Sequence, residues 1–176
     1  MLLSRALCGV LGSLAVLPLE LAQLALETGK RPHIQPLTEL SLSCAGGAIA
    51  FATQATAKKE LPPPWSTLVT VAALTPVAVT GQYLRLRARL GTRGLRPLFV
   101  AVVGLREAVL YSTLFAFSAE AYAPLIAHLI SYPIKLLSIA CYVTVAVRPI
   151  AVFSEILRAS LALWCSTWLE TNVMSS

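Results

Sequence analysis

Arg106 and Glu107 are adjacent ionisable residues inside an apolar stretch that has no other charge. Successive side chains on a helix point about 100° apart, so we expect Arg106 to face a partner on another helix, or a cavity, rather than Glu107. An arginine in such a stretch either anchors an anionic substrate or forms a buried ion pair, and both interpretations stay open. Glu155 and Arg158 are three residues apart, which places them on one helix face and predicts a structural ion pair.

Other residues of catalytic or metal-binding type are isolated. The four cysteines include no C-x-x-C pair, and neither histidine has a second ligand at a suitable spacing. The sequence contains no Asp, and it lacks a nucleophile elbow, a P-loop and a dinucleotide-binding fingerprint. We therefore expect no catalytic residue, no metal site and no cofactor, and we interpret the cysteines as small buried hydrophobic residues.

The composition indicates a membrane protein. Of the 176 residues, 57% are hydrophobic and 12% are charged, whereas a soluble domain has about 25% charged residues. The cations behind the net charge of +6 lie between apolar runs, which favours cationic loops at a membrane surface and argues against nucleic acid as a partner. Glu20 interrupts the first apolar run before any cleavage site, so we interpret that run as a retained helix rather than a signal peptide.

Six stretches are apolar enough, and close enough to the roughly 20 residues that a bilayer requires, to be membrane helices. They cover residues 2–27, 37–56, 65–84, 98–117, 124–145 and 150–172. The sequence therefore predicts an all-α integral membrane protein with six transmembrane helices in a single domain, residues 1–176.

The cations predict an orientation in the membrane. Eight lie in the connections after the first, third and fifth helices, and three lie on the opposite side. The eight are Lys30, Arg31, Arg85, Arg87, Arg89, Arg93, Arg96 and Arg148, and the three are Arg5, Lys58 and Lys59. By the positive-inside rule, the odd-numbered loops face the matrix or cytosol and both termini face the other compartment.

Proline recurs at a nearly fixed spacing. Pro18, Pro76 and Pro133 are 58 and 57 residues apart, and each lies in an odd-numbered predicted helix. A fixed period indicates internal repeats, here three helix pairs. The repeats cover approximately residues 1–60, 61–120 and 121–176.

These helices resemble the odd-numbered helices of the mitochondrial carrier family, which carry the motif P-x-[DE]-x-x-[KR]. The first helix has the proline and the acid, but glutamine replaces the base. The third helix keeps the proline alone, and the fifth has a lysine where the family has an acid. The remnants of the motif are Pro18, Glu20, Gln23, Pro76, Pro133 and Lys135.

A second element of the family is half retained. Gly94 and Phe99 match the glycine-to-aromatic spacing of the family's matrix segment, while Val100 and Ala101 replace its base and glycine. Family members are longer, and the difference corresponds to missing matrix helices. The resemblance implies a carrier-like bundle of three pseudo-repeated helix pairs.

In that family, the motif charges form interhelical ion pairs that close a gate on the matrix side. Only two of the six corresponding positions are charged here, Glu20 and Lys135; Ala78, Gly81 and Ser138 are among the others. We expect Glu20 and Lys135 to form a single fixed ion pair with a structural role, because alternating access needs ion pairs that form and break.

The arginine-rich segment between the third and fourth helices is a candidate site for lipid headgroups, with anionic cardiolipin as the natural ligand in a mitochondrial inner membrane. Its members are Arg85, Arg87, Arg89, Arg93 and Arg96. Small residues are dense over positions 43–50, which predicts a face for close helix packing or for a partner subunit.

From these observations we expect an accessory, non-catalytic subunit of a mitochondrial inner-membrane complex of the respiratory-chain or ATP synthase type. Its odd-numbered loops would lie in the matrix and its termini in the intermembrane space. The alternative is a reduced mitochondrial solute carrier that exchanges a small anionic metabolite, which Arg106 would explain more directly.

Overall fold

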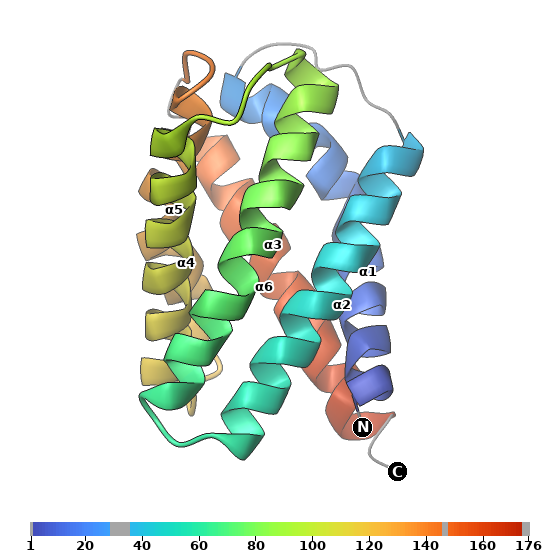
Figure 1. Cartoon of the computed structure of the whole chain (residues 1–176). Helices are drawn as coiled ribbons and strands as arrows, with labels where there is room; N and C mark the ends of the chain where they lie inside the picture. Colours follow the sequence, from blue (N-terminus) through green and yellow to red (C-terminus); the bar gives the residue numbers. More distant parts are fainter. Residues whose placement is uncertain (1, 29–35, 146–147, 174–176) are drawn as a thin grey trace.

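The computed structural model shows six α-helices joined by connections, and the described residues contain no β-strand (Figure 1). The structure describes residues 2–28, 36–145 and 148–173, without the side chains of residues 20–25, 28 and 36. The helices are α1 (Leu2–Thr28), α2 (Pro36–Glu60), α3 (Trp65–Leu90), α4 (Pro97–Ala116), α5 (Ala123–Ala140) and α6 (Pro149–Asn172).

Five of these helices are long and apolar enough to cross a membrane, and α2 is the one described helix that is not among them. It has 25 residues, but Ser, Thr, Gly and Ala occupy many positions where the other helices have Leu, Val or Ile. The predicted all-helical architecture is therefore confirmed. Five of the helices, rather than the predicted six, reach the hydropathy of a membrane span, which is compatible with a multi-pass membrane protein.

The helices form a ring. Each one packs against the next along the chain, and α1 closes the ring by packing against α6. Because the chain runs up and down, the start of α1 and the end of α6 lie at one end of the ring, as predicted, and the α3–α4 connection lies at the other (Figure 1). We call these the terminal end and the arginine end.

The predicted end of the third helix, at residue 84, was wrong. Arginine is a good helix former, and cations near a helix C-terminus interact favourably with the helix dipole, so α3 continues to Leu90. Gly91 then ends it in the left-handed conformation, with φ 67° and its N–H donating to the Arg87 carbonyl at 2.9 Å. The fifth helix is shorter than predicted and ends at Ala140, before the β-branched residues 143–145.

Glycines allow α1 to approach both of its neighbours in the ring. A Cβ on Gly9 would lie 2.1 Å from the carbonyl oxygen of Gly47 on α2. A Cβ on Gly12 would lie 2.1 Å from Ser166 Oγ and 2.6 Å from the Ala162 carbonyl oxygen, both on α6. The small-residue face of α2 is thus used within the protein at Gly47.

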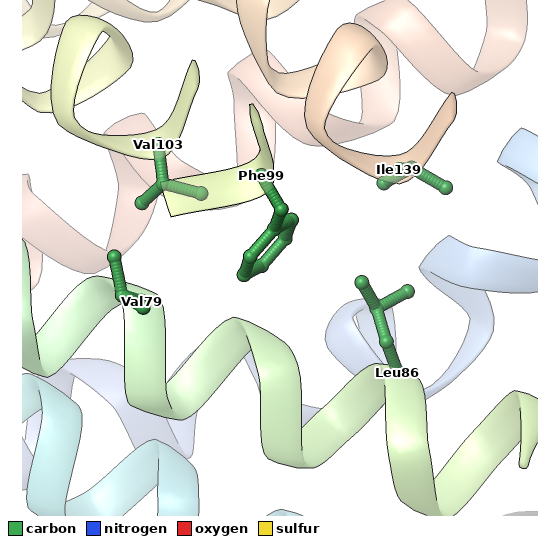
Figure 2. Packing of buried hydrophobic residues seen from close by; sticks show 5 residues of the cluster. All are labelled: Val79, Leu86, Phe99, Val103 and Ile139. Atoms are coloured by element: carbon green, nitrogen blue, oxygen red, sulfur yellow. The ribbon is translucent and has the colours of Figure 1, made fainter. Parts of the chain in front are cut away.

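An apolar cluster joins α3, α4 and α5 near the arginine end (Figure 2). Its buried members are Val79, Leu86, Phe99, Val103 and Ile139. Figure 2 shows the Phe99 ring pointing towards α3, in the space between Val79 and Leu86. The ring also meets Tyr142 edge-on, with centroids 5.3 Å apart.

Gly94 belongs to the same region of the structure. It has a φ of 74°, which favours glycine, and its carbonyl accepts a hydrogen bond from the Tyr142 hydroxyl at 3.1 Å. Gly94 and Phe99 therefore hold the α3–α4 connection against the end of α5. Pro18, Pro76 and Pro133 lie inside α1, α3 and α5, as predicted.

Candidate functional site

Three cations surround the carboxylate of Glu155, which is 2% exposed. Arg158 Nη2 and Lys135 Nζ lie 2.8 Å and 3.1 Å from Glu155 Oε2, and Arg106 Nη2 lies 3.9 Å from Oε1. The predicted pairing of Glu155 with Arg158 is confirmed. The structure adds Lys135 of α5 and Arg106 of α4, so that three helices converge on one buried carboxylate.

Lys135 also contacts a second carboxylate, on α1. Its Nζ lies 2.5 Å from Oε1 of Glu27, which is 1% exposed and belongs to α1. The side chains of Glu20 and Gln23 lie outside the described residues, so the predicted Glu20–Lys135 pair is not described. Glu27 is on the same helix, about two turns after Glu20.

Arg106 and Glu107 contact each other directly, and the expectation that they would not was wrong. Arg106 Nη1 lies 2.8 Å from Glu107 Oε1, because the long arginine side chain reaches around the helix to its neighbour. Glu107 is 4% exposed. Among the described residues, Arg106 Nε has no hydrogen-bond partner.

Two of the five arginines predicted to contact lipid headgroups make contacts with α2. Arg89 binds Glu39 with two hydrogen bonds of 2.5 Å, from Nε to Oε1 and from Nη2 to Oε2, and both side chains are buried. Arg85 lies on the same helix face one turn earlier; its Nε is 3.6 Å from Glu39 Oε2 and its Nη2 donates to Ser43 Oγ at 3.0 Å. These contacts join α2 and α3 at the arginine end.

The other three arginines of this group, Arg87, Arg93 and Arg96, are exposed at the arginine end. Arg96 lies over the Tyr142 ring, 5.1 Å from its centroid, and its Nη1 donates to the Cys141 carbonyl. Arg87 and Arg93 remain candidates for headgroup contact.

The buried charges line a cavity of about 120 Å³ inside the ring. Its charged lining residues are Glu27, Arg85, Arg89, Arg106, Lys135, Glu155 and Arg158. The lining has five cations and two carboxylates, but Glu39 contacts Arg85 and Arg89 and Glu107 contacts Arg106, so the network as a whole has a net charge of +1. A water takes about 30 Å³ of liquid volume, so the space suits a few waters or a small anion.

Further cavities continue from this one towards the terminal end. The next, of about 250 Å³, shares Arg85 and Arg158 with the first and is lined by residues from all six helices. A third, of about 390 Å³, shares Phe51 and Gln54 with the second and includes Arg5 in its lining. Internal spaces therefore follow the axis of the ring.

Within the described residues, no group of three or more His, Cys or Glu side chains is placed to hold a metal ion. Comparisons with protein-family models, with curated proteins and with solved structures gave no match. The fold and the site define a class: an all-helical protein with the architecture of a multi-pass membrane protein and a buried, cation-rich centre.

Proposed function

We propose that the protein is a non-catalytic accessory subunit of a mitochondrial inner-membrane complex, built on a degenerate carrier-like ring. The observation that carries this proposal is the position of Lys135, which joins Glu27 of α1 to Glu155 of α6 from its place on α5. A single side chain thus connects three helices inside the ring.

Such a connection favours a static role. A transport cycle needs two arrangements of the helices with different contacts. Separating α5 from α1 would leave the nearly fully buried Glu27 without the lysine, and breaking a buried ion pair costs on the order of 3–5 kcal/mol. The described carrier gate positions other than Lys135 offer no charge to compensate: Ala78, Gly81 and Ser138.

Several features support the carrier-like part of the proposal, including its three pseudo-repeats. The ring closes between α1 and α6, a proline lies inside each odd-numbered helix, and the described connection after α3 is rich in arginine. With the odd-numbered loops in the matrix, the termini face the intermembrane space. The proposed partners are other membrane subunits and anionic lipids.

Extraction from mitochondrial membranes with a mild detergent, followed by native electrophoresis and detection of an epitope on the chain, tests the subunit role. We expect the protein to migrate within a large assembly, and to separate from it only under conditions that dissociate that assembly. Migration at the mass of the single chain, from membranes in which a known complex stays intact, would contradict the proposal.

A second candidate function is favoured by the charge of the central cavity. A lining with five cations, which exceed the carboxylates they contact by one, and further cavities towards the terminal end suit a carrier that exchanges a small anionic metabolite. Purified protein in liposomes can be tested against nucleotides, phosphate and small carboxylates. Saturable exchange that Arg106→Ala abolishes would replace the subunit proposal with this one.

A further inference from the structure

We propose that an anionic phospholipid binds in a crevice between α2 and α3, with its phosphate at Arg85 and Arg106 and an acyl chain in the outer part of the crevice. This inference gives a specific site to the anionic lipids proposed above as partners, and it does not depend on the subunit role. The two helices are neighbours in the ring and lie side by side in Figure 1.

The outer part of the crevice is a largely apolar groove of about 350 Å³. Its lining residues are Leu42, Gly46, Ile49, Pro76, Val77, Thr80 and Gly81. Ile49 is 44% exposed, so the groove opens to the surroundings of the ring. An apolar groove between two membrane helices matches the chemistry of an acyl chain.

The groove continues inwards. A cavity of about 200 Å³ shares Leu42, Gly46, Val77 and Gly81 with it, and extends to Arg85, Arg106 and Glu107. Both arginines also line the central cavity. The crevice therefore has an apolar mouth and a cationic inner end, which complements a molecule with an apolar chain and an anionic head.

The order of these groups along α3 also matches a lipid. At 1.5 Å per residue, Arg85 lies roughly 8 Å from the end of α3 at Leu90, while Gly81 and Pro76 lie roughly 14 Å and 21 Å from it. Arg85 is thus close to the arginine end, at the expected depth of a headgroup, and Arg106 lies roughly 14 Å from the start of α4 at Pro97, as deep as Gly81. The apolar groove lies deeper, at the depth of acyl chains.

The two arginines suit a phosphate. A guanidinium binds phosphate oxygens with paired hydrogen bonds, and it tolerates burial better than an ammonium group does. Arg85 already contacts Glu39 and Ser43, and Arg106 contacts Glu107 and Glu155, so the ligand would join an existing network. The five cations of the central cavity exceed the four carboxylates that they contact by one, so a single added anion balances the charge of this network.

Two glycines keep the crevice open. A Cβ on Gly46 or Gly81 would meet no atom within 4 Å, in contrast to Gly9 and Gly12, where a Cβ would clash. The Cβ of a larger side chain at Gly46 or Gly81 would therefore lie in open space. This difference makes these two positions suitable for filling the crevice.

The test compares Gly81→Leu with a matched control, Ala72→Leu, which adds the same side chain to an exposed position of α3 that lines neither the groove nor the inner cavity. Thermal unfolding is followed in mixed micelles that contain either phosphatidylcholine alone or phosphatidylcholine with phosphatidylglycerol. We expect phosphatidylglycerol to raise the midpoint of unfolding of the unchanged protein and of Ala72→Leu. We expect Gly81→Leu to lose this rise.

Gly46→Leu and Arg85→Gln provide independent tests, since one fills the opposite wall and the other removes a cation. If Gly81→Leu fails to fold in phosphatidylcholine, the test depends on Gly46→Leu and Arg85→Gln. In both variants we expect phosphatidylglycerol to leave the midpoint of unfolding unchanged. Equal midpoints in the two lipid mixtures would overturn the proposal, as would a rise that survives in the variants. Stabilisation by inorganic phosphate alone, unaffected by Gly81→Leu, would assign the cationic end to a free anion and overturn the lipid site.

Discussion

Lys135→Met is the change that tests most directly whether the buried network holds the ring together. It keeps a side chain of similar length but removes the charge that contacts Glu27 at 2.5 Å and Glu155 at 3.1 Å. Glu155 retains Arg158 at 2.8 Å and Arg106 at 3.9 Å. The loss is therefore felt mainly at Glu27.

The magnitude follows from burial. Glu27 is 1% exposed and the side chain of Lys135 is 14% exposed, so water screens their contact weakly. Removing one partner of a buried ion pair costs on the order of 3–5 kcal/mol, because the other charge stays buried. With Glu27→Gln as well, no carboxylate remains to be compensated at that position. We expect the double variant to be about 1–3 kcal/mol more stable than the sum of the two single changes predicts.

The assay is a double-mutant cycle in one detergent, with unfolding followed by circular dichroism. Lys59→Met serves as the matched control, because Lys59 is exposed at the terminal end and its loss should change stability by less than about 0.5 kcal/mol. A cycle in which the Lys135 and Glu27 changes add without coupling would refute the role assigned to this pair. So would a Lys135→Met variant as stable as Lys59→Met.

Three further outcomes are expected. Gly12→Leu should lower the free energy of unfolding by about 1–3 kcal/mol, because its Cβ would lie 2.6 Å from a backbone carbonyl oxygen of α6. Thermal stability equal to that of Ala72→Leu would contradict this packing. Tyr142→Phe should cost about 0.5–1.5 kcal/mol per lost hydrogen bond, since the hydroxyl contacts Gly94 and the Arg96 amide; an unchanged unfolding midpoint would count against that role. In a variant whose own cysteines are replaced by alanine, Leu95→Cys should resist an impermeant thiol reagent applied from the side of the termini, and labelling from that side would reverse the proposed orientation.

Much of the architecture follows from patterns that are local in the sequence. Apolar runs of about 20 residues separated by prolines and charges predict the number of helices, and an even number places both termini at one end. The three-residue spacing of Glu155 and Arg158 predicts their ion pair, because helix geometry alone brings them together. The presence of a proline inside each odd-numbered helix likewise follows from the predicted helix ranges alone.

The residues that form the buried network cannot be predicted from local sequence patterns, because the packing of distant helices brings them together. Glu27 was interpreted as the last residue of a helix, where an acid usually meets water, yet the packing of α1 beside α6 places it against Lys135 of α5. Arg85 and Arg89 were assigned to a loop because they are cationic. Helix propensity extends α3 through them, and their spacing of four then turns both towards Glu39.

Glycine has opposite effects at different joints of this ring, where a joint is the contact between two neighbouring helices. At Gly9 and Gly12, the absence of a side chain lets α1 touch α2 and α6, so the joints on both sides of α1 are closed by backbone contact. At Gly46 and Gly81, nothing occupies the space that a side chain would take, so the joint between α2 and α3 stays open along the groove. At the arginine end the two helices are held together by the ion pair of Glu39 and Arg89 and by the hydrogen bond from Arg85 to Ser43. We therefore expect the proposed lipid to stabilise the ring at the contact between α2 and α3, where an apolar groove lies beside the ion pair of Glu39 and Arg89.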